Sequence, residues 1–228
     1  MPGGTRRRQR HARRLLRARY TLHMSQPAPV SPHPELQLPA DDIIVLQNVT
    51  WADYQRLLEI RGERAVPRLT YVEGALELMT PSRPHESIKS MIGCLVEAWC
   101  LEKGVAITPY GSWTIESKEA DRGVEPDECY VVGNVDDPER CDLAIEIIWS
   151  SGRLDKLDVY RKLGVKEVWI WKAGRLDVFS LQNDAYVPTD RSGLLPGIDL
   201  ATLLRFADVK PMTRAVTDYR AALRSPAG

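Results

Sequence analysis

The sequence predicts a single α/β domain built around a mixed β-sheet. Three observations lead to this expectation: an apolar face at helical spacing from His85 to about Lys103, a nearly all-apolar run from Asp142 to Trp149, and a second apolar run from Glu167 to Trp171. Continuous apolar runs are typical of strands buried on both faces, and a helix between two such strands leaves them parallel. The chain of 228 residues is long enough to bury one core of this kind.

A helix, a β-hairpin and a long helix are expected in the first half of the domain. Their predicted spans are 51–58 for the first helix, 69–72 and 75–79 for the hairpin strands, and 85–103 for the long helix. Thr50 precedes the first helix as an N-cap, Glu73-Gly74 is a turn-forming pair, and Gly104 ends the long helix. Pro81 and Pro84 separate the hairpin from that helix.

Strands dominate the second half. They are expected at 105–109, 112–115, 127–132, 142–149, 167–171, 175–181 and 185–187. An amphipathic helix is expected over about 153–163, a loop or short helix over 200–206, and a closing helix over 213–223. The order strand, helix, strand between 142 and 171 predicts a parallel pair, and the last two strands should extend the sheet antiparallel.

Charge divides the chain into two unlike parts. Residues 1–23 contain eight arginines and no acid, so removing them from the 31 basic and 31 acidic residues leaves 23 against 31, a net charge of −8. Such an arm can bind phosphate backbones, act as an acid-poor targeting peptide, or be translated sequence that the fold does not use, with Met24 as a second start. Because prolines are dense between 27 and 39, we expect a disordered leader over 1–40, the domain over 41–224 and a tail over 225–228.

Several classes of protein are excluded. No window contains the 18 or so apolar residues of a membrane span, and no secretory segment is recognisable, so a cytoplasmic location is the default expectation. The four cysteines form no C-x-x-C pair and the four histidines lack zinc-site spacing, so we expect reduced core thiols and no structural zinc. Phosphate-loop, dinucleotide, nucleophile-elbow and H-E-x-x-H motifs are all missing from the sequence.

Two acidic residues lie in predicted core strands, where ionisable side chains are not expected. Glu146 lies in the middle of the apolar run 142–149, and Asp127 opens the preceding strand. If those strands are neighbours, the two carboxylates converge and offer the oxygen ligands that Mg²⁺ prefers, with Lys156 close enough to stabilise extra negative charge. The residues alone leave other interpretations open: Glu146 paired with a cation, Asp127 capping a turn, and Lys156 as an exposed helix lysine paired with Asp155 or Asp158.

An ordered series of sequence blocks resembles a known bacterial family, the Uma-type restriction endonucleases of the PD-(D/E)XK nuclease superfamily. The blocks are Thr50-Trp51-Ala52-Asp53-Tyr54, Tyr71 to Ser82, His85, Val124-Glu125-Pro126-Asp127, Leu143 to Ile147, Asp155-Lys156-Leu157 with Tyr160, Gly164 to Ile170, and Leu195-Pro196-Gly197-Ile198. No single block is diagnostic, but their order and spacing together are specific. They cover about two-thirds of the chain, from Val49 to Phe206.

This resemblance implies a restriction-endonuclease-like core, a central mixed sheet flanked by helices, and hydrolysis of DNA with Mg²⁺ or Mn²⁺. Asp127 would be the Asp of the PD motif and Glu146 the acid of the E-x-K motif, both as metal ligands. Ile148 stands where the lysine of that motif is expected, so we assign the lysine's catalytic role to Lys156. Glu77 and His85 match recurring family positions and are additional site candidates.

The sequence beyond residue 23 has a net negative charge, so binding of DNA requires a local group of basic residues at the surface, which we call the basic lip. Candidates are Arg61, Arg64, Arg68, Arg83, Lys89, Arg153, Lys156, Arg161 and Lys162, of which Arg83, Arg153 and Lys162 are assigned to nucleic-acid binding. Such nucleases often cut as dimers, so a homodimer is a further expectation. Because Ile148 replaces the usual lysine, the alternative is a weak or inactive nuclease-fold module that binds nucleic acid or a protein; a third reading is a scaffold whose acidic pair is structural.

Overall fold

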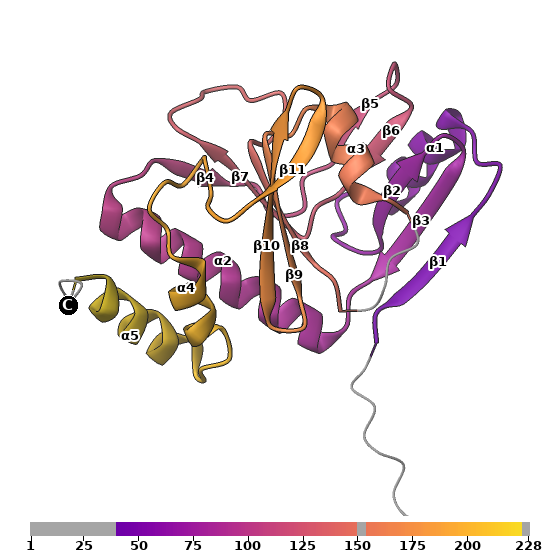
Figure 1. The fold of residues 1–228 in the computed structure, drawn as a ribbon. Helices are drawn as coiled ribbons and strands as arrows, with labels where there is room; N and C mark the ends of the chain where they lie inside the picture. The colour runs from indigo at the N-terminus through magenta and orange to yellow at the C-terminus, as the bar shows by residue number, and fades with distance from the viewer. Residues whose placement is uncertain (1–39, 150–153, 225–228) are drawn as a thin grey trace, which may run out of the picture. The chain divides into compact units, whose positions relative to one another are not determined.

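Two β-sheets and five α-helices make up the part of the chain that the computed structural model describes, residues 40–149 and 154–224 (Figure 1). The strands are β1 (Asp42–Leu46), β2 (Arg68–Val72), β3 (Ala75–Thr80), β4 (Ile107–Pro109), β5 (Ile115–Ser117), β6 (Arg122–Val124), β7 (Glu128–Val132), β8 (Leu143–Ile147), β9 (Glu167–Lys172), β10 (Arg175–Gln182) and β11 (Ala185–Thr189). The helices are α1 (Trp51–Arg61), α2 (Arg83–Lys103), α3 (Lys156–Leu163), α4 (Leu200–Ala207) and α5 (Met212–Arg224). The fold is therefore α/β, as predicted.

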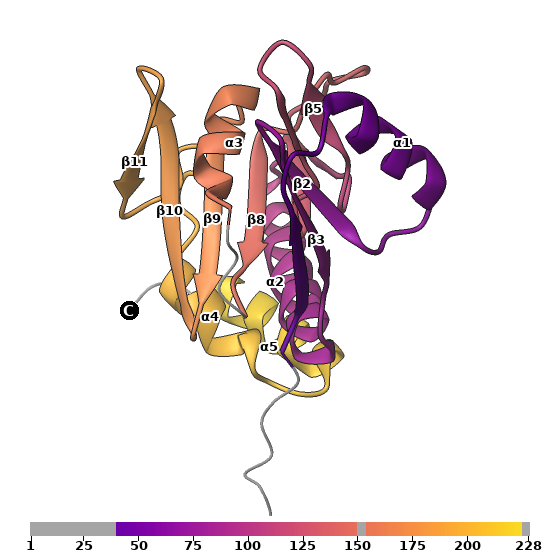
Figure 2. The same cartoon turned by 90° about the vertical axis from the view of Figure 1, so that its right-hand side faces the viewer.

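The six-stranded sheet is mixed, with the order β11-β10-β9-β8-β7-β4. Strands β8 and β9 are parallel, from Leu143 opposite Glu167 to Ile147 opposite Trp171, and α3 connects them. This confirms the predicted strand, helix, strand unit. On one side β10 and β11 extend the sheet antiparallel, so that β11, β10, β9 and β8 lie side by side (Figure 2). On the other side β7 pairs antiparallel with β8.

Both faces of the mixed sheet are covered. On one face α2, α4 and α5 form an apolar core with Ile145, Ile147 and the two buried tryptophans of β9, Trp169 and Trp171. On the other face α3 packs through Val159 against apolar residues of both sheets. Because successive strand residues alternate between faces, Glu146 points toward the α3 side.

The second sheet is antiparallel, with the order β1-β3-β2-β6-β5, so the single central sheet expected from the sequence is accompanied by another. Its β2–β3 hairpin confirms the predicted turn at Glu73-Gly74. Helix α1 packs on this sheet, where the ring of Tyr54 stacks on Tyr71 with centroids 5.0 Å apart. Thr50 caps α1 as predicted, in a reciprocal capping box with Asp53.

Two strands were missed and some boundaries differ. Strand β1 is an edge strand with alternate residues exposed, and β6 has only three residues, so neither forms a recognisable apolar run. The strand expected at 112–115 is β5, which begins at Ile115. Helix α3 begins at Lys156 rather than at about 153, because the side chain of Asp155 accepts from the first backbone N–H groups.

Three segments lie outside the described residues: 1–39, 150–153 and 225–228. The predicted leader, apart from residue 40, and the predicted tail therefore stay predictions, and Arg153 belongs to the undescribed part of the chain. All four cysteines are free thiols, as expected. Within the described helices, none combines the length and apolar character needed to cross a membrane.

Candidate active site

Glu146 lies on β8, and Asp127 immediately precedes the neighbouring strand β7, which begins one residue later than predicted. Strands β7 and β8 pair with Glu128 opposite Ile145, and one further step of this register places Asp127 opposite Glu146. Directly opposed residues of an antiparallel pair project from the same face of the sheet. The exposed fractions of Asp127 and Glu146 are only 0% and 4%. The strands are thus neighbours, which was the condition on which the sequence prediction depended.

Helix α3 supplies two partners for Glu146. The ammonium Nζ of Lys156 donates to Glu146 Oε2 at 2.7 Å, and the hydroxyl of Tyr160 donates to Glu146 Oε1. Lys156 is the first residue of α3 and Tyr160 lies one turn later, so both side chains reach β8 from one face of the helix. Lys156 therefore pairs with Glu146, and neither Asp155 nor Asp158 is its partner in an ion pair among the described residues.

Burial and neighbouring charges set the protonation of this pair. Burial raises the pKa of Glu146, and the nearby charge of Asp127 adds to that rise, while Lys156 opposes it. Burial disfavours the ammonium of Lys156, but the carboxylates of Glu146, Asp127 and Glu77 outweigh it and raise the pKa of Lys156 above its ordinary value. Lys156 is therefore a cation at neutral pH.

Three donors surround the carboxylate of Asp127. Its Oδ1 accepts from the guanidinium of Arg68 and from Nε2 of His85 at 2.9 Å, and its Oδ2 accepts from the backbone N–H of Ile147 at 2.7 Å. Burial opposes ionisation, but the His85 hydrogen bond and the charges of Lys156 and Arg68 prevail and lower the pKa of Asp127 to about 2. Asp127 is therefore ionised and firmly oriented.

His85 joins Asp127 to a further acid that the sequence did not suggest. Its Nδ1 lies 2.9 Å from Oδ2 of Asp41, while Nε2 faces Asp127. Burial lowers the basicity of His85, but hydrogen bonds and charge from both carboxylates raise its pKa above the ordinary value. Both ring nitrogens lie 2.9 Å from a carboxylate oxygen, which favours the doubly protonated imidazolium.

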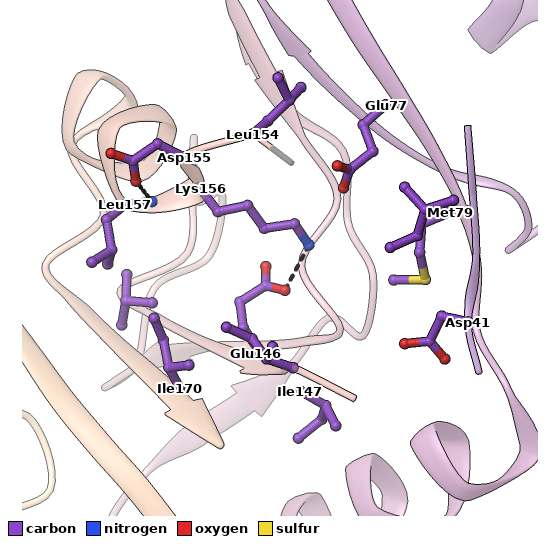
Figure 3. A pocket seen from close by; sticks show the side chains of 13 residues that line it. Asp41, Glu77, Met79, Glu146, Ile147, Leu154, Asp155, Lys156, Leu157 and Ile170 are labelled. Carbon is purple, nitrogen blue, oxygen red and sulfur yellow. Dashed lines mark hydrogen bonds and ion pairs between the residues drawn. The ribbon is translucent and has the colours of Figure 1, made fainter. Parts of the chain in front are cut away.

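A cavity of about 200 Å³ opens beside Glu146, and its lining includes Asp41, Glu77 and Lys156. Figure 3 shows Glu77 and Glu146 directed toward the ammonium of Lys156 from different strands, with Asp41 across the cavity. Around this point four carboxylates (Asp41, Glu77, Asp127, Glu146) face three cationic groups (Arg68, His85, Lys156). Carboxyl groups thus outnumber basic side chains around this point, which favours an added cation.

The structure brings together most of the predicted site residues. Asp127, Glu146 and Lys156 form one cluster, Glu77 lines the adjoining cavity, and His85 contacts Asp127. Arg83 lines a different hollow, and Lys162 is an exposed residue of the last turn of α3, so neither is part of the cluster.

The prediction that Arg68 lies on a basic surface is wrong, and two residues that contact the site, Asp41 and Tyr160, were not predicted to do so. Arg68, a candidate for a basic surface lip, is 4% exposed and pairs with Asp127 and Glu86. Its position at the start of an apolar strand was the available sign of burial. Asp41 had no signal, because it lies outside any recognisable pattern, whereas Tyr160 was part of a family block without a role.

The donor set fits a divalent cation. A carboxylate offers about four lone-pair directions; three protein donors face Asp127 and two face Glu146, so both keep acceptor capacity. No group of three or more His, Cys, Asp or Glu side chains in residues 40–149 and 154–224 is arranged as a metal cage. Mg²⁺ is commonly held by one or two carboxylates and completes its shell with water and substrate phosphate, so Asp127 and Glu146 suit it.

The chain has an α/β fold, and a family model that matches most of it places it in the class of restriction-endonuclease-like proteins. The chain belongs to the Uma2 family, described as "Putative restriction endonuclease", whose model matches residues 51–207. A crystal structure of "a putative nuclease belonging to DUF820" from Anabaena variabilis ATCC 29413 is similar, with 13% identity, 71% of this chain and 96% of that chain covered, and a TM-score of 0.44. No curated protein matches the chain.

Proposed function

We propose that the protein is a divalent-metal-dependent endonuclease that hydrolyses phosphodiester bonds of DNA, with Asp127 and Glu146 as metal ligands and Lys156 as electrostatic catalyst. The observation that carries this proposal is the joint placement of the two buried carboxylates, Asp127 immediately before β7 and Glu146 on β8, with the Lys156 ammonium 2.7 Å from Glu146. Membership of the Uma2 family supports it.

A bound Mg²⁺ or Mn²⁺ would polarise the phosphate and lower the pKa of an attacking water. The residues of the chain have separate tasks around it. Asp127 is held ionised by Arg68 and His85, so its remaining lone pair keeps a constant direction. Lys156 is a cation at neutral pH, and it therefore stabilises the extra negative charge of the transition state rather than accepting a proton.

Lys156 also compensates for the absence of the motif lysine at position 148, where this chain has Ile148. The motif lysine is missing after β8, but Lys156 of α3, the helix that follows, contacts the carboxylate of Glu146. We infer that Lys156 replaces the motif lysine, since a flexible side chain from an adjoining helix can place its charge where the strand residue would. The absence of a lysine at position 148 is therefore no argument for an inactive module.

The test is nicking of supercoiled plasmid DNA with Mg²⁺ or Mn²⁺, compared with EDTA. Removing groups that only orient metal ligands typically costs 10- to 100-fold, so Asp127→Asn and Glu146→Gln should each lower the rate by at least about 100-fold. Glu128→Gln is the matched control, because Glu128 is adjacent to Asp127 but projects from the opposite face of β7.

DNA binding without cleavage under any divalent metal, unchanged by Asp127→Asn, would contradict the proposal and support the inactive binding module. Loss of thermal stability in Asp127→Asn without any effect of metal would instead support a structural role for the acid pair. The homodimer is a separate proposal that sedimentation velocity of the protein, alone and with DNA, would test.

A further inference from the structure

A groove lies apart from the carboxylate cavity, around Trp149. It has a volume of about 780 Å³ and is bordered by the first turns of α2, the β9–β10 turn and the end of α4. A smaller hollow of about 260 Å³ adjoins it and shares Trp149 and Trp171 in its lining. We refer to the two together as the Trp149 groove.

An aromatic platform forms the wall of the Trp149 groove. The rings of Trp149 and Trp171 are parallel within 3°, with centroids 5.9 Å apart. Trp171 is buried in the core, with 6% exposed, whereas Trp149 is only partly buried. Trp171 therefore packs against one side of the Trp149 ring, and a partly exposed indole of this kind is a suitable surface for stacking a nucleobase.

Three basic residues lie around the stacked rings of Trp149 and Trp171. Arg83, Lys172 and Lys210 are exposed and line the groove, and none of the three makes an ion pair with a described residue. Asp208 is the one acidic residue among the described residues that line it. The groove is therefore locally cationic on a body whose sequence beyond residue 23 carries a net charge of −8, which favours a polyanion.

The groove is close to the carboxylates along the chain. Trp149 follows Glu146 by three residues, which is at most about 10 Å of extended backbone, and Arg83 precedes His85 by two on α2. A strand of nucleic acid can span such a separation with one or two nucleotides. The alternation of faces places Trp149 on the α2 side of β8 and Glu146 on the α3 side, so that strand would pass around the end of β8.

We propose that the Trp149 groove binds an unpaired nucleotide of a nucleic-acid strand, with the base stacked on Trp149 and the flanking phosphates near Arg83, Lys172 and Lys210. Its relation to the reacting phosphate rests on the proposed nuclease function, but the binding itself does not. The groove thus selects DNA that is locally single-stranded beside the cleavage site.

Fluorescence anisotropy of labelled single-stranded (dT)₈ in EDTA tests the binding without cleavage. Because base–aromatic stacking is lost on alanine substitution, Trp149→Ala should weaken binding by about 5- to 150-fold, with Trp149→Phe in between. Arg83→Ala, Lys172→Ala and Lys210→Ala should each lower the slope of log affinity against log salt by about 0.7. Circular dichroism of Trp149→Phe verifies the fold, since Trp149 also packs against the core.

Two controls match these variants. Trp113 is a partly buried tryptophan next to the other sheet, and Lys118 is an exposed lysine between β5 and β6 without an ion pair to a described residue. Trp113→Ala and Lys118→Ala should leave (dT)₈ affinity unchanged. A blunt duplex of equal length should compete less well than (dT)₈.

Equal affinity of Trp149→Ala, Trp149→Phe and the wild type for (dT)₈ would overturn the inference, as would equal competition by the duplex. If plasmid nicking persists in that case, the groove proposal fails alone. If (dT)₈ binding depends on Trp149 but no metal supports nicking, the nuclease proposal fails and the groove remains.

Discussion

Lys156→Met tests the buried pair on which the proposed site depends. The change keeps the length of the side chain but removes the ammonium 2.7 Å from Glu146 Oε2. The Glu146 side chain is 5% exposed, so its carboxylate would be left in a poorly solvated site with Tyr160 as its remaining side-chain donor among the described contacts. The folded variant can escape this cost by protonating Glu146.

The free energy of protonating Glu146 is therefore the upper limit of the loss in folding stability. Protonating a carboxyl group with the ordinary pKa of 4.5 costs about 1.4 kcal/mol per pH unit above that value, hence about 3.4 kcal/mol at pH 7 and about 0.7 kcal/mol at pH 5. In the variant the folded-state pKa of Glu146 is raised above the unfolded value, so the folded form binds the extra proton. Its stability therefore falls as pH rises from 4.5 toward the folded pKa.

The assay is urea unfolding followed by circular dichroism at pH 7 and pH 5, without metal. We expect Lys156→Met to cost up to about 3 kcal/mol at pH 7 and below about 1 kcal/mol at pH 5. Combining it with Glu146→Gln should recover most of the loss, because replacing both members of a buried pair is far less costly than removing one.

Lys166→Met is the matched control. Lys166 lies 2.7 Å from Asp142, the same separation, but the side chain of Lys166 is 62% exposed, against 14% for Asp142. Water therefore solvates the ammonium and screens the pair, so the loss should be about 0 to 1 kcal/mol. Equal losses for Lys156→Met and Lys166→Met, or a loss for Lys156→Met that does not change between pH 7 and pH 5, would refute the reasoning.

Three further predictions concern stability. Tyr160→Phe removes the hydroxyl that donates to buried Glu146 and should cost about 1.5 to 3 kcal/mol in urea unfolding; a loss below 0.5 kcal/mol would mean that the bond is not made. Thr50→Ala breaks the capping box with Asp53 and should cost about 1 kcal/mol, whereas Thr50→Asn should recover it. The lowered pKa of Asp127, about 2 against an ordinary 3.8, contributes about 2 kcal/mol that is present above pH 4 and lost as pH falls toward 2; acid unfolding of Asp127→Asn should lack this component, and an unchanged acid profile would contradict it.

Local pattern predicted most of the mixed sheet and its covering helix. The long helix shows one apolar face from Ile88 to Trp99, and β8 and β9 are continuous apolar runs, so burial is visible in the sequence itself. Edge strand β1 alternates exposed and half-buried residues, and β6 has three residues, so their pairing depends on partners distant in the chain. The extra sheet was therefore beyond local patterns.

The candidate site, too, was predicted only in part from the sequence. The two acids could be found because an ionisable side chain in an apolar strand is costly and demands an explanation. The donors that hold Asp127 could not, since Arg68 lies 59 residues before it in the chain and Asp41 acts through His85, 44 residues further on. Lys156 was predicted only as a substitute within reach.

The sequence by itself determined the order of the main elements and the identity of the acid pair, because hydrophobic periodicity and misplaced charge are properties of neighbouring residues. Only the tertiary structure decided which groups neutralise those acids. Helix α3 brings Lys156 and Tyr160 to Glu146, and the register of β7 with β8 sets Asp127 beside it. Ion pairing inside a fold depends on distance in space, and separation along the chain does not encode that distance.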